Sequence, residues 1–346
     1  MIKWIKLPEE TKRKAYYQIA EDKGMNAFAV EKDWWVVQTL SAVFSTEVSN
    51  NLVFKGGTSL SKAWNLIQRF SEDIDLAINR EFFGFTDDLS KNQRDKLRKQ
   101  SGAYVAQTFF TELKAQFLEK GLHDVRIELV EETESDKDRK INIYYPNVIP
   151  SSSYLEPRVQ IEITSRSLRE PFTVRSFATL VDEAWPEAEF IQPPIHVPSV
   201  NPERTFLEKI FLLHEEFQRP PGKMRVARLS RHLYDVVIIS KTEFAVKALA
   251  DPILYETIVE HRHKFTRIGG VNYNFHNPQN IKIIPYPEII GAWRKDYKTM
   301  IEQMIWGVET PSFDAIIGEL EMLEDKIHTL PWKLNKEYPI PGKLNP

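Results

Sequence analysis

The sequence contains no cysteine. Disulfide bonds and thiolate metal sites are therefore excluded, and nothing argues for secretion into an oxidising compartment. The chain also lacks an uninterrupted apolar run near the roughly 20 residues that span a bilayer. Its first residues, MIKWIKLPEETKRKAYY, hold no apolar segment of the kind that signal peptides carry. These absences predict a cytoplasmic protein that does not bind a membrane.

An excess of positive charge is absent as well. The 46 Lys and Arg residues stand against 49 Asp and Glu, so the formal net charge is -3. Proteins that clamp nucleic acid are usually basic overall. Any contact with nucleic acid must therefore use a local basic patch or phosphates bridged by metal. The length of 346 residues and the apolar content of 42% allow one large domain or two, with a sizeable core.

Apolar spacing divides the chain into a mixed part and a helical part. Residues 8–45 and 87–120 show helical spacing. The proline-rich residues 184–202 are interpreted as the connection between the two parts. Alternating apolar residues predict half-buried strands at 124–130, 140–146 and 158–164.

We therefore predict an α+β fold with a mixed sheet flanked by helices. The sheet and its N-terminal helices occupy residues 1–200, and a mostly helical domain occupies 201–330. The proline-containing residues 331–346 are expected to form an extended tail.

Residues 54–78, FKGGTSLSKAWNLIQRFSEDIDLAI, place two carboxylates inside an apolar strand. Side chains alternate along a strand, so Asp73 and Asp75 point to one face while Ile74 and Leu76 point into the core. Two carboxylates so close repel each other unless a cation lies between them. Oxygen ligands of this kind suit Mg²⁺ or Mn²⁺.

The two glycines upstream of these acids predict a phosphate site. Gly56 and Gly57 lack a Cβ, so backbone amides can approach a phosphate closely. Thr58 or Ser59 is expected to cap the helix that follows, whose N-terminus would attract an anion. A phosphate cradle beside a metal-binding pair is what nucleotidyl transfer requires.

Glu162 is the candidate for a third metal ligand. It lies between isoleucines in RVQIEIT, where an unpaired charge is costly. If this strand lies beside IDLAI, Glu162 joins the two aspartates. The alternative is an exposed residue on an edge strand.

Several motifs together resemble the nucleotidyltransferase AbiEii/AbiGii toxin family, within the DNA polymerase beta-like superfamily. They lie in roughly residues 30 to 240. The matching stretches are EKDWWVVQTL, FKGGTSLSKAW, RFSEDIDLAI, RTFLEKIFLLHEEF and RLSRHLYDVVII.

The resemblance implies a nucleotidyltransferase-like domain whose active site is completed by the helical domain. It implies metal-dependent transfer of a nucleoside monophosphate from an NTP, with the 3′ end of tRNA or another RNA as acceptor. It also implies a toxin of a toxin–antitoxin or abortive-infection (phage defence) system, paired with a cognate antitoxin.

The resemblance also assigns roles to residues. Asp73 and Asp75 would bind magnesium, Lys209 would contact the nucleotide phosphates, and Asp235 would match the family's second essential acid. The implied nucleotide-binding residues are Lys55, Gly56, Gly57, Thr58, Ser59 and Arg69.

Two of these assignments have plain structural alternatives. Lys209 lies in an apolar helical stretch, where its side chain could reach solvent along the helix. Asp235 could pair with Arg231, four residues earlier. If Asp235 is functional, it could either orient Lys209 or act as a base.

The basic run RPPGKMRVARLSRH, residues 219–232, is the candidate RNA-binding segment. Arg225, Arg228 and Arg231 fall on a similar face if the run is helical. They would then either form a patch for the phosphate backbone of RNA or belong to a solvated helix.

Two other functions stay open at this point. The chain could be a stand-alone nucleotidyltransferase that modifies a small molecule or a protein hydroxyl. It could also be a binding module that keeps the fold without catalysis, although the intact GGTS and DID sequences argue against this.

Overall fold

The computed structural model describes residues 2–71, 73–86, 88–130, 139–150, 156–266, 268–306 and 310–340. The chain forms two compact units. One comprises Met1–Val200 with Trp306–Val308, and the other Asn201–Ile305 with Glu309–Pro346. Across the described residues, no helix is both long and apolar enough to cross a membrane.

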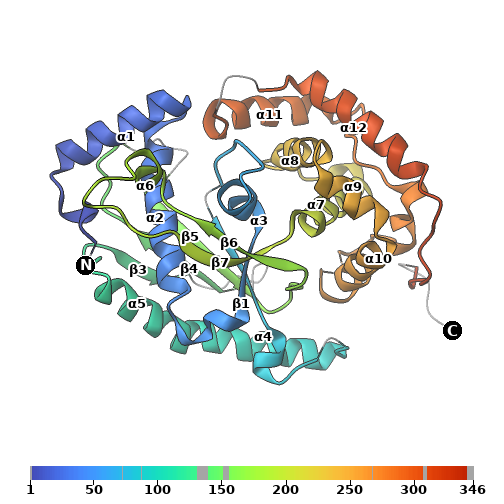
Figure 1. Ribbon diagram of the computed structural model, residues 1–346. Helices are drawn as coiled ribbons and strands as arrows, with labels where there is room; N and C mark the ends of the chain where they lie inside the picture. Colours follow the sequence, from blue (N-terminus) through green and yellow to red (C-terminus); the bar gives the residue numbers. More distant parts are fainter. Residues whose placement is uncertain are drawn as a thin grey trace. The chain divides into compact units, whose positions relative to one another are not determined.

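Within its described residues, the first unit holds a seven-stranded mixed sheet in the order β3-β4-β5-β2-β1-β7-β6 (Figure 1). The pairs β2–β5 and β1–β7 are parallel, and the other neighbours are antiparallel. The strands are β1 (Leu52–Lys55), β2 (Asp73–Ile78), β3 (Arg126–Leu129), β4 (Arg139–Tyr144), β5 (Arg158–Thr164), β6 (Phe172–Phe177) and β7 (Ile195–Val200).

The three strands predicted from alternation are confirmed as β3, β4 and β5. In β5, Val159, Ile161 and Ile163 are buried, and the polar residues between them are half-buried. Strands β5 and β2 lie side by side in the interior of the sheet, each with a neighbour on its other edge. Their apolar residues therefore fill the core of the first unit.

Helix α2 (Ala27–Val43) is the central helix of this unit. It packs against α1 (Glu9–Lys23), α5 (Phe110–Glu119), α6 (Leu180–Ala184) and the sheet. Because it is covered on several sides, nearly all of its residues are buried, two charged ones included. The other helical segments are η1 (Trp4–Lys6), η2 (Glu47–Asn51), α3 (Gly56–Thr58), η3 (Ser59–Ala63), η4 (Arg80–Phe83), α4 (Lys91–Tyr104) and η5 (Val105–Phe109).

The second unit is helical, as predicted, and is built around α7 (Pro202–Phe217). This helix packs against α8 (Ser230–Ser240), α9 (Glu243–Ala250) and α10 (Pro252–His261). Most apolar residues of α7, among them Phe206, Leu207 and Ile210, are fully buried and form the core of this unit. The remaining segments are η6 (Pro221–Lys223), η7 (Arg262–Thr266), η8 (Tyr273–His276), η9 (Pro278–Asn280), α11 (Ile290–Met304) and α12 (Phe313–His328).

Residues 331–340 of the predicted tail contain no helix or strand, and residues 341–346 lie outside the described residues. Glu256 of α10 accepts hydrogen bonds from the backbone N–H groups of Asn335 and Lys336. Lys336 also pairs with Glu260 at 2.7 Å. The tail is therefore held along α10.

The interpretation of residues 184–202 as a connection is wrong in part. They contain β7, which lies between β1 and β6 in the sheet. Strand β6 and the short helix α6 were also not predicted. Proline cannot donate to a neighbouring strand, so the proline content of this segment, with Pro198 inside β7 itself, concealed the strand.

Candidate active site

The acidic pair lies on β2 as the alternation predicted. Ile74 and Leu76 are fully buried on one face, while Asp73 and Asp75 are half-buried on the other. Strand β2 is an interior strand, so its backbone is held on both sides. The two carboxylates therefore project from a fixed part of the sheet.

The turn after β1 comes into direct contact with Asp75. Gly56 has a φ of +80°, and a Cβ at this position would lie 2.0 Å from Oδ2 of Asp75. A Cβ on Gly57 would lie 2.7 Å from Nη2 of Arg69 and 2.8 Å from the Ser71 hydroxyl. Both glycines are needed because other groups occupy the space that a side chain would take.

Arg69 is 1% exposed, and its Nη1 donates to the carbonyl of Phe70 at 3.1 Å. Since its other terminal nitrogen lies beside Gly57, the guanidinium borders the turn. Its location is compatible with the expected phosphate contact, although its burial shows that it also supports the turn.

Thr58 and Ser59 do not cap the helix, so that prediction is wrong. The helix begins at Gly56 and continues as the π-helical η3. The Thr58 hydroxyl instead donates to the backbone carbonyl of Asp73 at 2.5 Å. Ser59 is 2% exposed, and its hydroxyl makes no hydrogen bond within the described residues. Thr58 thus joins the turn to the strand that carries the acids.

Strand pairing places Glu162 beside Asp75. The two residues are partners in the parallel β2–β5 register, and Lys55 is the partner of Asp75 on the other side. Strand β5 is not an edge strand, so the edge-strand alternative for Glu162 is wrong. Glu162 also pairs with Lys140 of β4 at 3.4 Å, and both side chains are partly exposed.

In the second unit, Lys209 of α7 and Asp235 of α8 form a buried ion pair. Their Nζ and Oδ2 atoms are 2.8 Å apart, and the side chains are 9% and 0% exposed. The same Nζ lies 3.4 Å from Nδ1 of His232. Lys209 therefore does not extend along its helix into solvent. A buried pair is destabilised strongly when one partner is lost.

Comparison with known proteins identifies the family. The model of the nucleotidyl transferase AbiEii toxin family, from type IV toxin–antitoxin systems, matches residues 39–319. The chain belongs to the AbiEii family. No curated protein matches the sequence. Membership makes the chain a nucleotidyl transferase toxin that uses an NTP, and it implies a cognate antitoxin.

The acidic strand of this AbiEii protein carries oxygen ligands of the kind that bind Mg²⁺. Across the part of the chain that the structure describes, no three His, Asp or Glu side chains gather as a metal-binding group. Magnesium in nucleotide enzymes is usually held by one or two carboxylates together with substrate phosphates and water. Asp73 and Asp75, on one face of β2 beside the glycine turn, fit that arrangement.

The charged residues of α2 make contacts that the sequence did not indicate. The Glu31 carboxylate accepts hydrogen bonds from the N–H groups of Val148 at 2.7 Å and Ile149 at 3.0 Å. Burial raises the pKa of Glu31 to about 7, although these two donors oppose the rise. The signal in the sequence was the EKD triplet, three charged residues inside an otherwise strongly apolar helical stretch.

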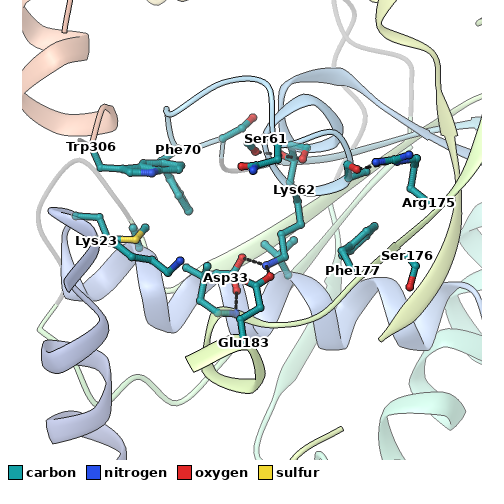
Figure 2. Close-up of a pocket in the computed structure, with 18 residues that line it drawn as sticks. Lys23, Asp33, Ser61, Lys62, Phe70, Arg175, Ser176, Phe177, Glu183 and Trp306 are labelled. Carbon is teal, nitrogen blue, oxygen red and sulfur yellow. Dashed lines mark hydrogen bonds and ion pairs between the residues drawn. The ribbon is translucent and has the colours of Figure 1, made fainter. Parts of the chain in front are cut away.

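Asp33 connects α2 to the helix of the glycine turn. Its carboxylate pairs with Lys62 of η3 at 2.8 Å and accepts a hydrogen bond from the N–H of Leu180 at 2.7 Å (Figure 2). Lys62 also lies 3.8 Å from Glu183. Burial raises the pKa of Glu183, although the charge of Lys62 opposes the rise. This contact fixes the far end of the segment that begins with the two glycines.

The candidate RNA-binding arginines of this AbiEii protein do not share a helical face, so that expectation is wrong. Helix α8 begins at Ser230, and Arg225 and Arg228 precede it. Arg228 has a φ of +63°, and its N–H donates to Asp296 at 2.7 Å. Only Arg231 lies in the helix.

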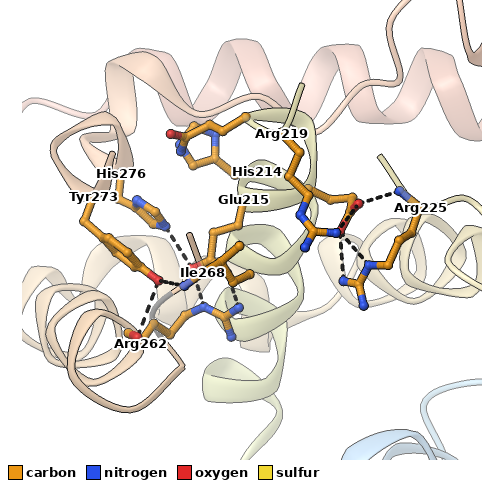
Figure 3. Close-up of polar contacts among 10 residues, drawn as sticks. His214, Glu215, Arg219, Arg225, Arg262, Ile268, Tyr273 and His276 are labelled. Carbon is orange, nitrogen blue, oxygen red and sulfur yellow. Dashed lines mark hydrogen bonds and ion pairs between the residues drawn. The ribbon is translucent and has the colours of Figure 1, made fainter. Parts of the chain in front are cut away.

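Arg225 is bound to a glutamate on α7. Its Nη2 and Nε donate to Glu216 Oε2 at 2.8 and 3.0 Å, and its guanidinium stays largely exposed (Figure 3). Burial raises the pKa of Glu216, but the hydrogen bonds from Arg225 outweigh it and lower the pKa overall. Arg225 is therefore positioned by a carboxylate and still faces solvent.

A second charged cluster holds the second unit together (Figure 3). Arg262 pairs through Nε and Nη2 with the carboxylate of Glu215, which is 0% exposed. His276 lies 3.3 Å from the same carboxylate. The cluster ties α7 to η7 and η8, and no motif in the sequence revealed it because its members are far apart along the chain.

Proposed function

We propose that the chain transfers a nucleoside monophosphate from an NTP to an RNA hydroxyl, with the 3′ end of tRNA as the leading acceptor. The observation that carries this proposal is the contact between the glycine turn and the acidic strand. Gly56 lies against the Asp75 carboxylate, and Thr58 is bonded to the Asp73 carbonyl. Phosphate-binding amides and metal-binding oxygens thereby become neighbours, as the chemistry requires.

The reaction joins the acceptor oxygen to the α-phosphorus of the NTP and breaks the bond from that phosphorus to the oxygen that leaves with pyrophosphate. The attacking hydroxyl loses its proton to solvent water. Asp73 and Asp75 would hold Mg²⁺ or Mn²⁺, with Glu162 as a further ligand once it is released from Lys140. A bound cation of this kind acidifies the attacking hydroxyl and neutralises phosphate charge. The backbone N–H groups of Gly56 and Gly57, at the start of the helix, would donate to the triphosphate.

The remaining nucleotide contacts are assigned to groups beside the turn. Thr58 keeps the turn attached to β2, and the Ser59 hydroxyl, which has no partner within the described residues, is a donor for a phosphate oxygen. Arg69 and Lys55 would supply positive charge next to the glycine turn. The roles of these four residues are proposed from their location and charge.

Lys209 is proposed to contact the nucleotide phosphates, with Asp235 as its positioning residue. The 2.8 Å ion pair supports orientation over a role as base, because a carboxylate that is already paired with an ammonium is a weak proton acceptor.

Arg225, Arg228 and Arg231 are proposed to contact the phosphate backbone of the acceptor RNA. The exposed guanidinium of Arg225, held by Glu216, is the best supported of the three. Phosphate contacts of this type position RNA without reading its sequence.

Label transfer tests the proposal directly. The purified protein is incubated with total RNA, Mg²⁺ and each of the four α-labelled NTPs, alongside Asp73→Asn and Asp75→Asn. Asp124→Asn, at an exposed position outside the site, is the matched control. We expect a discrete labelled RNA with wild type and control only.

The outcomes also separate the alternatives. No labelled RNA, but label on an added protein or small molecule, would indicate a stand-alone transferase with another acceptor. No label on any acceptor would contradict catalysis and favour a binding module. Growth arrest that persists in Asp73→Asn would point the same way.

A further inference from the structure

A hollow of about 490 Å³ lies within the second unit. Its walls come from the end of α7, the segment 270–282, Tyr286 and the end of α12. Phe275 on this wall is 50% exposed, and Asn280 and Lys282 are exposed as well, so the hollow opens to the surface. Pockets that enclose a small ligand usually measure about 300–1,000 Å³. The hollow therefore has room for a group the size of a nucleoside, and none of the roles proposed above uses it.

Two amide side chains on the wall have fixed orientations. Gln279 uses Nε2 to donate to the carbonyls of Leu330 at 2.7 Å and Trp332 at 3.0 Å, and its buried Oε1 accepts no hydrogen bond within the described residues. Asn272 uses Oδ1 to accept from the backbone and side-chain N–H groups of Asn274 at 3.1 and 2.9 Å. Its Nδ2 is therefore left as a donor. The wall thus offers an acceptor and a donor that rotation of the amides cannot exchange.

His214 contributes a neutral polar ring to the same wall. Its Nδ1 accepts a hydrogen bond from the N–H of Lys282 at 3.0 Å. Burial holds the pKa of His214 well below its usual range, and the nearby His276 lowers it further, although Glu215 opposes the shift (Figure 3). The imidazole is therefore uncharged at pH 7. Because a phosphate is bound most strongly by charged donors, a wall of amides and a neutral ring suits an uncharged heterocycle better.

Aromatic surface and one ammonium group complete the hollow. Phe275 and Tyr286 line it, and the Tyr286 hydroxyl is fixed by donating to the carbonyl of Phe217 at 2.9 Å. The exposed Nζ of Lys282 lies 5.8 Å from the centre of the Tyr286 ring and forms no ion pair within the described residues. Unpaired bases of RNA bind by stacking on such rings while polar side chains contact their edges. A lysine beside the opening is then placed for the phosphate that follows the base.

We propose that this hollow in the second unit captures one unpaired base of the acceptor RNA, with the base against Phe275 and its phosphate near Lys282. Every base presents a neighbouring donor and acceptor on its edge, which fits the acceptor of Gln279 and the donor of Asn272. The inference rests on the proposed function, which makes RNA the acceptor. A free nucleoside has the same base chemistry, so the experiment must separate the two sources.

The test measures binding of the full chain to a labelled single-stranded oligoadenylate and to free adenosine, both without NTP, so that no transfer takes place. The variants are Phe275→Ala, Phe275→Trp and Lys282→Ala. The controls are Ile253→Ala, at a side chain that is 78% exposed outside the hollow, and Lys295→Ala, at an exposed position of α11. All these side chains are at least half exposed or at exposed positions, so the variants are expected to fold.

Loss of one stacked base should weaken oligoadenylate binding in Phe275→Ala roughly 5- to 150-fold. Phe275→Trp keeps a stacking ring and should retain most of the affinity. Lys282→Ala should lower the slope of log Kd against log salt concentration by about 0.7, the value for one phosphate contact with a single strand. Both controls should bind as wild type does.

Two further probes show whether the hollow takes a base of RNA. A blunt RNA duplex has no unpaired base, so wild type and Phe275→Ala should bind it equally, and weaker duplex binding in the variant would contradict base capture. If Phe275→Ala weakens adenosine binding but leaves oligoadenylate binding unchanged, the hollow serves a free nucleoside and the proposal is wrong. Equal binding of every probe by all variants would mean that the site does not exist.

The base site and the proposed function can fail separately. If wild type labels no RNA but Phe275→Ala still weakens oligoadenylate binding, the transfer function is wrong and the base site remains. If label transfer proceeds while oligoadenylate binding is equal in all variants, the function remains and the base site is wrong. Where both hold, Phe275→Ala should raise the KM for RNA and leave kcat nearly unchanged, because the contact is made before and during transfer alike.

Discussion

Replacing Gly56 by alanine tests the contact on which the site depends. The new Cβ would lie 2.0 Å from Oδ2 of Asp75, so the carboxylate must move. Gly56 also has a φ of +80°, a conformation that costs a residue with a side chain about 1–2 kcal/mol. Moving Asp75 off its rotamer adds about 1 kcal/mol.

Gly84 provides the matched control. Its φ is +77°, and a Cβ there would meet nothing within 4 Å. Gly84→Ala should therefore lower the free energy of unfolding by the same backbone contribution of about 1–2 kcal/mol. It should leave nucleotidyl transfer unchanged, because no site residue has to move.

The two variants are compared by urea unfolding and by label transfer. We expect Gly56→Ala to be less stable than Gly84→Ala by about 1 kcal/mol. Its transfer rate should fall about 100-fold, because small displacements of a reacting group have effects of that size. Equal stability and equal activity in the two variants would refute the reasoning, since the carboxylate would then not occupy the space beside Gly56.

Three further predictions concern buried charges. Because the pKa of Glu31 is raised from 4.5 to about 7, its favourable contribution is complete below pH 4.5 and is lost as pH rises through 7. Wild type should thus lose about 3 kcal/mol of stability across that range, and Glu31→Gln should lose none of it in urea titrations. Lys209→Met and Asp235→Asn should each lower the free energy of unfolding by about 3–5 kcal/mol, with the double variant less affected than the sum; an additive result would contradict a direct pair. Although burial opposes it, pairing with Arg262 lowers the pKa of Glu215 to about 2. Its contribution of about 3 kcal/mol should be present above pH 4.5 and disappear as pH falls toward 2, a loss that Glu215→Gln should not show in acid unfolding.

The acidic pair and the glycine turn could be predicted because their signals are local. Alternation along six residues assigns the two faces of β2. Two adjacent glycines indicate that another group approaches the backbone closely, and neither signal depends on distant parts of the chain. Glu162 was reached by a weaker argument, the cost of a charge between isoleucines. The residue of β2 that lies beside Glu162 depends on the order of strands in the sheet, and no single segment of the sequence determines that order.

The predictions that failed depended on distant contacts. Arg228 follows a helical pattern in the sequence, but its backbone turns because the Asp296 carboxylate binds its N–H. Thr58 was predicted as a helix cap, but its hydroxyl donates to the carbonyl of Asp73 instead. In both cases a partner far along the chain competed with the local preference.

The position of β2 between two strands also determines which changes in length the chain tolerates. Side chains alternate, so a slip of one residue in β2 would turn Asp73 and Asp75 into the core and expose Ile74 and Leu76. Pairing with β1 and β5 opposes such a slip from both edges. One extra residue between Asp73 and Ile78 would therefore exchange the two faces of β2 beyond the insertion.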